Sequence, residues 1–281
     1  MATRFSAKYQ KSMATNRPGG RYDMVADTYA NILMKIIDAG NTDFLQVYGA
    51  VYKLITESDK AGCTTYKQAV FNLPPIAKEN KNKKQCTTDP SILYQQAAIA
   101  HPMYGKIIRE IINSFNDGVE ASLPSKLKNM ARIVEKCVLK RNGINVGNAN
   151  KVCDIVRGMI TCRDITKVAE FITVLGTTKS IVITRVKDRF FDRPSGGGWR
   201  DCMINFFIKD DPNQHICEIQ IVHAMLLTAR KGLPGHAIYN RVRNASELLA
   251  QLPKSQPKDF KELTDWIYEV MDPNSKNTHG K

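Results

Sequence analysis

Residues 193–209 read RPSGGGWRDCMINFFIK and pass from three consecutive glycines into a strand-like run. The run Arg200–Lys209 is rich in Ile and Phe, which favour β-strands. Three other segments have this texture: Val152–Cys162, Ser180–Phe190 and His215–His223. Pro212 and Asn213 form a turn signal between the last two segments, so these two are predicted to pair antiparallel.

Helical patterns surround the strands. Apolar residues recur at spacings of three and four from Tyr22 to Ser58, and a basic amphipathic helix is predicted over residues 125–141. With a helical interval at Ile165–Leu175, the chain is predicted to be α+β, a mixed β-sheet flanked by helices, with an all-helical N-terminal region. We expect a disordered arm (1–20), a helical region (21–118) and a second domain with C-terminal helices (119–281). The N-terminal helices are interpreted as a scaffold packed on the sheet or, alternatively, as a partner-binding or neutralising segment.

Composition narrows the class of protein. The chain has 281 residues and 43% hydrophobic content, with no apolar run long enough for a membrane helix and no signal peptide. A cytoplasmic protein without membrane contact is therefore expected. The net charge of +14 attracts polyanions such as nucleic acid or nucleoside phosphates. The seven cysteines lack CxxC spacing and are predicted to be buried thiols.

Two carboxylates lie in segments predicted to be strands. In HICEIQIVH, residues 215–223, period-two alternation puts Glu218 and Gln220 on the face opposite the apolar Ile219. Asp154 enters an otherwise nearly apolar segment, where burial demands a partner or a metal. Two carboxylates in a basic region suggest a divalent-cation site beside a phosphate-binding surface. The alternative is that Asp154 and Glu218 are structural ion-pair partners of Arg or Lys.

The glycine loop offers a second set of groups. The backbone of Gly196–Gly198 can approach a ligand closely and donate amides to an anion, and Trp199 offers a ring face for a base. A turn followed by a core aromatic residue is the alternative interpretation.

Six blocks occur in order between residues 120 and 245: SKLKNMARIVEK, CDIVRGMITC, VITRVKDRF, GGWRDCMINF, CEIQIVH and GHAIYNRVR. Together they resemble the RelA/SpoT-like synthetase domain of alarmone synthetases. The resemblance implies a nucleotidyltransferase-like fold that transfers the pyrophosphate of ATP, with Mg²⁺, to the ribose 3′-hydroxyl of GDP or GTP. It also implies an enzyme, a nucleotide pyrophosphokinase that is often oligomeric.

The resemblance implies roles for particular residues. Asp154 matches the magnesium-binding aspartate of the family, and Glu218 matches its second acidic residue, which binds metal or activates the 3′-hydroxyl. The implied donor-nucleotide residues are Lys126, Lys128, Arg132, Lys136 and Arg157. The implied acceptor-nucleotide residues are Lys187, Arg189, Trp199, Arg200, Gln220, His236 and Tyr239.

The chain departs from the family pattern at several positions. Lys126 replaces an arginine of the donor block, Met159 stands where the family has arginine, and Trp199 replaces tyrosine. No His-Asp dyad occurs in the chain, so a hydrolase half is not expected. Two alternative functions stay open: pyrophosphorylation of the 3′ end of tRNA, and binding of nucleotide or RNA without turnover.

Overall fold

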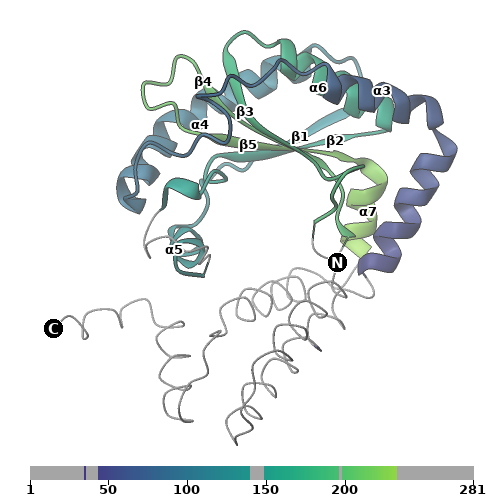
Figure 1. Cartoon of the computed structure of the whole chain (residues 1–281), viewed down its shortest axis with the longest axis horizontal. Coiled ribbons are helices and arrows are strands. Elements are labelled where there is room, and N and C mark those ends of the chain that lie inside the picture. The colour runs from purple at the N-terminus through teal and green to yellow at the C-terminus, as the bar shows by residue number, and fades with distance from the viewer. Residues whose placement is uncertain (1–34, 36–43, 140–148, 196–197, 233–281) are drawn as a thin grey trace, which may run out of the picture. The chain divides into compact units, whose positions relative to one another are not determined.

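The computed structural model describes Lys35 and residues 44–139, 149–195 and 198–232, and its centre is a five-stranded sheet (Figure 1). The strands are β1 (Val119–Ser122), β2 (Arg157–Cys162), β3 (Ile181–Asp188), β4 (Cys202–Ile208) and β5 (Cys217–His223). Their order across the sheet is β1-β2-β5-β4-β3. The β2–β5 pair is parallel and the other three pairs are antiparallel, so the predicted mixed sheet is confirmed.

The turn between β4 and β5 forms the predicted antiparallel hairpin. The side chain of Asp211 accepts hydrogen bonds from the backbone N–H groups of Asn213 (3.0 Å) and His215 (2.7 Å). Gln214 adopts a positive φ of 46°, which completes the reversal of the chain. The hairpin joins the two strands that carry most of the sheet core.

Helices surround the sheet. Residues 44–58 are helical, and the further helices are α3 (Lys60–Phe71), α4 (Pro90–Asn113), α5 (Met130–Leu139), the 3₁₀ helix η1 (Ala149–Lys151), α6 (Ile165–Thr177) and α7 (Ala224–Gly232). Aspartates cap three of these helices: Asp59 before α3, Asp89 before α4 and Asp164 before α6. Apart from the last residues of α5, the described elements from residue 44 onward belong to one compact unit.

The helices α3, α4 and α6 lie on one side of the sheet in Figure 1, and α5 and α7 lie on the other. Tyr104 of α4 stacks on Phe206 of β4 with ring centroids 5.8 Å apart, and Phe115 stacks on Phe171 of α6. The first contact packs α4 on one face of the sheet by the hydrophobic effect, and the second joins the segment after α4 to α6. The described part of the N-terminal helical region therefore packs on the sheet, whereas its role and the domain division at residue 118 stay predictions.

Two predicted boundaries were wrong. Strand β2 begins at Arg157 rather than Val152, so Asp154 lies before the strand and not within it. Helix α5 begins at Met130 rather than residue 125, because Asn129 caps it by accepting a hydrogen bond from the backbone N–H of Ala131 (2.9 Å). Lys126 and Lys128 consequently lie in the loop that leads into α5.

Strand β1 was not predicted. This strand has four residues, is mostly exposed and lies at the edge of the sheet, so it lacks the apolar alternation by which the other strands were found.

Five of the seven cysteines are buried as predicted, whereas Cys86 is exposed and Cys137 is half-buried. Among the described residues, none of the helices has the length and apolar character that crossing a membrane requires.

Candidate active site

Strand alternation and register assemble a polar row on the sheet face opposite α4. Glu218 of β5 pairs in register with Arg157 of β2 on one side and with Asn205 of β4 on the other, and Asn205 pairs with Arg185 of β3. One pleat further along, Gln220 lies between Met159 and Met203, and Met203 pairs with Lys187. Successive side chains on a strand point to opposite faces, so these residues share one face while Ile204 and Ile219 enter the core. The fold thus brings together Arg157, Lys187, Glu218 and Gln220, which the sequence selected separately.

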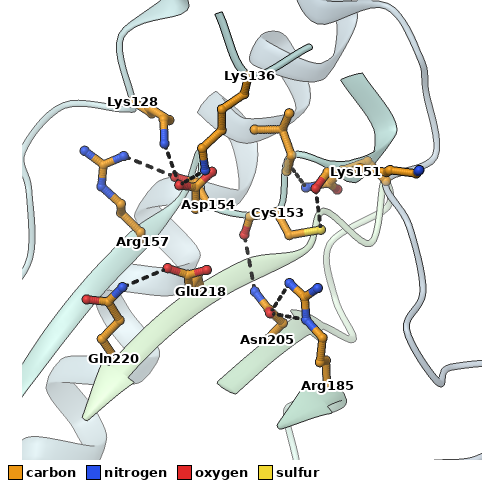
Figure 2. A network of polar contacts seen from close by, with 12 residues as sticks. Lys128, Lys136, Lys151, Cys153, Asp154, Arg157, Arg185, Asn205, Glu218 and Gln220 are labelled. Atoms are coloured by element: carbon orange, nitrogen blue, oxygen red, sulfur yellow. Dashed lines mark hydrogen bonds and ion pairs between the residues drawn. The ribbon is translucent and has the colours of Figure 1, made fainter. Parts of the chain in front are cut away.

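Asp154 lies at the edge of this face, held by two lysines (Figure 2). Its Oδ2 atom accepts hydrogen bonds from Nζ of Lys128 (2.5 Å) and Nζ of Lys136 (2.6 Å). Lys136 comes from α5, and the preceding loop is fixed to the sheet because the backbone N–H of Lys128 donates to the carbonyl of Ile155 (3.2 Å). The side chain of Asp154 is only 15% exposed, and its other oxygen, Oδ1, is buried without a hydrogen-bond partner.

The charges of this cluster are strongly coupled. Burial tends to raise the pKa of Asp154, but Lys136 and Lys128 outweigh it and hold the pKa well below its usual value. Burial also acts on Lys128, whose pKa falls to about 8 because desolvation and the nearby Lys136 outweigh the attraction of Asp154. Burial opposes the charge of Lys136 as well, yet Asp154 raises its pKa. Asp154 is therefore ionised at neutral pH.

Glu218 occupies the neighbouring position, and Figure 2 shows its carboxylate on the same side of the sheet as that of Asp154. Burial and the negative charge of Asp154 raise its pKa. Nε2 of Gln220 donates to Oε1 of Glu218 at 3.2 Å. Glu218 is thus a carboxylate whose ionised form is destabilised, which is the property of a proton acceptor.

The two carboxylates fit a magnesium ion. Oδ1 of Asp154 is buried without a hydrogen-bond partner, and a cation bound there would offset the unfavourable charge of Glu218. Mg²⁺ is usually bound through one or two carboxylates and retains several waters. Within the ranges described, no group of three or more His, Cys, Asp or Glu residues is arranged for metal binding. A magnesium ion would therefore be held by Asp154 and Glu218, with water and substrate completing its coordination.

Asn205 and Arg185 extend the polar row and were not predicted. Oδ1 of Asn205 accepts two hydrogen bonds from Arg185, from Nε (2.8 Å) and Nη2 (2.6 Å). Its Nδ2 atom donates to the carbonyls of Cys217 (3.1 Å) and Cys153 (3.4 Å), and Cys153 immediately precedes Asp154. Asn205 therefore ties β4 and β5 to the segment that carries Asp154. In the sequence, the feature that could have indicated Asn205 is that it is the single amide in the otherwise apolar run CMINFFI.

The segment after the glycines is held by a chain of polar contacts. Arg189 binds both carboxylate oxygens of the fully buried Asp201 (2.5 and 2.6 Å), and Oδ2 of Asp201 accepts a hydrogen bond from the indole N–H of Trp199 (2.9 Å). The guanidinium of Arg230 in α7 lies 5.0 Å from the centroid of a Trp199 ring. Trp199 is half-buried and packs against the core, as the alternative of a core aromatic residue expects, and its role as a surface for a base stays a prediction.

The other predicted residues have different surroundings. Arg157 donates from Nη1 to the backbone carbonyl of Asp154 (3.4 Å), whereas Arg200 donates from Nη1 to the carbonyl of Phe190 (2.5 Å). Arg132 is half-buried near the start of α5, and Lys126 and Lys187 are exposed. The predicted residues outside the described ranges are Gly196, Gly197, His236 and Tyr239.

In chemical terms, the face combines an ionised aspartate, a destabilised glutamate and several cations, a set of groups suited to holding a divalent cation and phosphate oxygens. No protein-family model and no curated protein matches the chain.

The solved structures that match this chain include two alarmone synthetases and a GTP pyrophosphokinase family protein. Small alarmone synthetase 1 from Bacillus subtilis, bound to its product pppGpp, is 20% identical over 64% of this chain and 96% of its own, with a TM-score of 0.38. Small alarmone synthetase 2 from the same organism is 24% identical over 64% and 92%, also with a TM-score of 0.38. A GTP pyrophosphokinase family protein from Streptococcus pneumoniae is 19% identical over 64% and 96%, with a TM-score of 0.40.

Proposed function

We propose that this chain is a Mg²⁺-dependent pyrophosphokinase that transfers the pyrophosphoryl group of ATP to the ribose 3′-hydroxyl of GDP or GTP. The observation that carries the proposal is the placement of Asp154 and Glu218 on one side of the sheet, next to Lys128 and Lys136. Pyrophosphoryl transfer depends on positioning the reactants and neutralising phosphate charge, and this cluster supplies groups for both.

The two carboxylates are assigned different roles because their surroundings shift their pKa values in opposite directions. Asp154 stays ionised and, together with Glu218, would hold Mg²⁺, which when bound would supply positive charge to the phosphates. We also assign Glu218 to accept the proton of the 3′-hydroxyl as the oxygen attacks. The new bond joins that oxygen to the transferred pyrophosphoryl group, and AMP leaves.

The cations are assigned to the phosphates of the donor. Lys128 and Lys136 already converge on one oxygen of Asp154, and their ammonium groups have three donors each, so they can bind phosphate oxygens while they still contact the carboxylate. Arg132 and Lys126 precede or begin the same helix, and we assign them to the outer part of the donor site. Arg157, anchored on the carbonyl of Asp154, takes the position next to Glu218 across the parallel strand pair.

The acceptor is assigned to the part of the sheet face beyond Glu218. Gln220 donates to Glu218, Lys187 lies in the same row of residues, and Trp199 provides the aromatic surface for the guanine. Arg189 and Arg200 contact protein groups near Trp199, so their proposed role is to support the acceptor segment. His236 and Tyr239 keep the acceptor-side assignment that the resemblance implies.

The test is transfer of label from γ-labelled ATP with Mg²⁺ to GDP, GTP, ADP, ATP or deacylated tRNA, each supplied separately. Label on a guanine mononucleotide is the expected result. Label on tRNA alone would move the substrate to the RNA 3′ end, for which the net charge of +14 is suited. No label on any acceptor, despite measurable nucleotide binding, would overturn the enzymatic proposal and leave a nucleotide-binding protein.

Three variants connect the activity to the site. Asp154→Asn and Glu218→Gln are each expected to abolish transfer with little change in shape. Asp117→Asn is the matched control, because Asp117 is a 64% exposed carboxylate paired with Arg163, outside the polar row. A parallel thermal-shift titration with Mg²⁺ and ATP should raise the melting temperature of the wild type and of Asp117→Asn more than that of Asp154→Asn. Equal shifts in all three would remove Asp154 as the metal ligand.

A further inference from the structure

Helix 44–58 contacts residues 198–200, which are the last glycine of the loop and the two residues that follow it. Leu45, Tyr48 and Tyr52 lie three and four positions apart, so they share one helix face. Their partners are consecutive: Gly198, Trp199 and Arg200. The sequence assigned no site chemistry to this helix, because its apolar spacing is that of any packed helix.

The first contact depends on glycine. Gly198 has a φ of +84°, and a Cβ atom placed on it would lie 3.2 Å from Cδ2 and 3.4 Å from Cα of Leu45. A side chain at position 198 is therefore disfavoured both by backbone conformation and by the approach of the helix. The segment meets the helix at the residue immediately before Trp199.

The second contact orients the indole of Trp199. Tyr48 is 4% exposed, and its ring meets Trp199 edge to face, with centroids 5.4 Å apart and an interplanar angle of 75°. The indole N–H donates to Asp201, which is itself held by Arg189. Trp199 is thus restrained at its N–H by Asp201, which precedes β4, and at its ring by helix 44–58, and the two contacts fix the plane of the ring.

The third contact engages Arg200. Its guanidinium lies 3.7 Å from the centroid of the Tyr52 ring, which is a cation–π distance. The same guanidinium donates to the carbonyl of Phe190, and Tyr52 packs against the Phe190 ring at 5.4 Å. The cation of Arg200 therefore fixes the end of β3 and the start of β4 to the helix.

We propose that helix 44–58 is a positioning element of the nucleotide site, in which Tyr48 sets the orientation of Trp199 and Tyr52 holds Arg200. Neither tyrosine is assigned a contact with substrate. The assignment of Trp199 to the acceptor base rests on the proposed function, but the positioning itself rests only on the contacts described here. A chain that lacks these rings should retain the carboxylates and lysines and lose affinity for the acceptor.

The first test requires no activity. The chain has two tryptophans, so Trp266→Phe leaves Trp199 as the sole fluorophore. In that background, Tyr48→Leu should shift the emission of Trp199 to longer wavelength and increase its quenching by acrylamide. Tyr48→Phe keeps the ring and should restore the parent spectrum. Leu54→Ala, on the same helix at a 54% exposed position, is the control. Unchanged emission in a folded Tyr48→Leu protein would overturn the proposal.

Tyr48 is buried, so Tyr48→Leu can lower stability as a whole, and circular dichroism and thermal melting should accompany the spectra. Tyr52→Leu is the second variant, because Tyr52 is only half-buried. It should also increase quenching of Trp199, since the release of Arg200 loosens the adjacent residue, and Tyr52→Phe should reverse the effect. If Tyr48→Leu does not fold and Tyr52→Leu leaves quenching unchanged, the proposal is wrong.

The second test uses nucleotides. With transferase activity present, Tyr48→Leu and Tyr52→Leu should raise KM for the acceptor about tenfold, or about 1.4 kcal/mol, with KM for ATP changed less than about twofold. A fall in kcat with no change in acceptor KM would contradict the positioning role. Without activity, GDP binding measured by quenching of Trp199 replaces KM. Failure of the proposed function thus appears as missing turnover in the wild type, whereas failure of this inference appears as unchanged Trp199 spectra.

Discussion

The Nζ atom of Lys136 lies 2.6 Å from Oδ2 of Asp154, and this ion pair joins α5 to the segment that precedes β2. The same carboxylate oxygen also binds Lys128, so a single side chain holds both the helix and the loop that leads into it. Glu218 lies beside this largely buried group of charges, and its pKa responds to both Asp154 and Lys136. The two ammonium groups can donate to phosphate oxygens as well as to the carboxylate, which is why the ion pair is informative about function.

Asp154→Asn is expected to destabilise the fold by about 2–4 kcal/mol at pH 7, because it leaves two partly buried lysines without their counter-charge. The folded protein holds the pKa of Asp154 below its usual value, so this stabilisation is present above about pH 4 and is lost as pH falls further. Urea unfolding at several pH values measures both effects. If the difference in the free energy of unfolding between wild type and variant stays the same in strong acid, the ion pair is not the cause of the stabilisation.

Glu218→Gln is expected to raise stability at neutral pH by about 0.5–2 kcal/mol, although it should abolish turnover. The raised pKa means that ionised Glu218 is unfavourable in the folded protein, and a neutral amide of the same shape removes that cost. The gain should disappear below about pH 4.5, where the carboxyl is protonated in both states. Thermal unfolding of both proteins at pH 4 and pH 7.5 tests the prediction, and a variant less stable at pH 7.5 would refute it.

From the lowered pKa of Lys128 we expect activity to fall at alkaline pH. Its pKa of about 8 means that its positive charge is present below that pH and is lost as pH rises through it. If Lys128 binds donor phosphate, kcat/KM for ATP should fall above pH 8. Lys128→Met should lower kcat/KM by about 10- to 100-fold and flatten this limb of the profile. An alkaline limb that is identical in the variant would assign the titration to another group.

Asn205→Ala is expected to cost about 2–4 kcal/mol, because it leaves Arg185 and two backbone carbonyls without a buried partner and opens a small cavity. Activity should fall as well, since one of those carbonyls belongs to the residue next to Asp154.

Asn205→Asp keeps an acceptor for Arg185 but adds a third carboxylate near Glu218, so it should raise the pKa of Glu218 further. Chemical denaturation gives the first effect and the acidic limb of the pH–rate profile gives the second.

Gly158→Ala tests the packing beneath the site. A Cβ atom at Gly158 would lie 2.6 Å from the hydroxyl of Tyr104 and 2.7 Å from Cδ2 of Leu123, so the variant should lose about 1–3 kcal/mol. Tyr104 also donates from its hydroxyl to the backbone carbonyl of Glu218 (3.1 Å). Adding Tyr104→Phe removes the hydroxyl and should recover part of the loss, which a double-mutant cycle detects. Strictly additive losses would show that the hydroxyl is not the obstacle.

Much of the sheet was predictable because alternation is a local property of a strand. HICEIQIVH indicates by its pattern alone that Glu218 and Gln220 share one face, and the Pro212–Asn213 turn predicts the hairpin that the structure confirms. These features depend on neighbouring residues, and the sequence displays them directly.

Boundaries and partners were harder to predict. Asp154 was expected within a strand, but pairing with β5 begins only at Arg157, and register is a property of two strands rather than one. Several contacts of the site join residues that are far apart in the chain. They are the ion pair of Lys136 with Asp154, the hydrogen bond from Asn205 to Cys153, and the ring contact of Tyr48 with Trp199. The sequence by itself determined which side chains share a face of each strand and that the chain is α+β. The tertiary structure alone decided which charges and rings meet, because those contacts depend on how the helices and loops pack across the sheet.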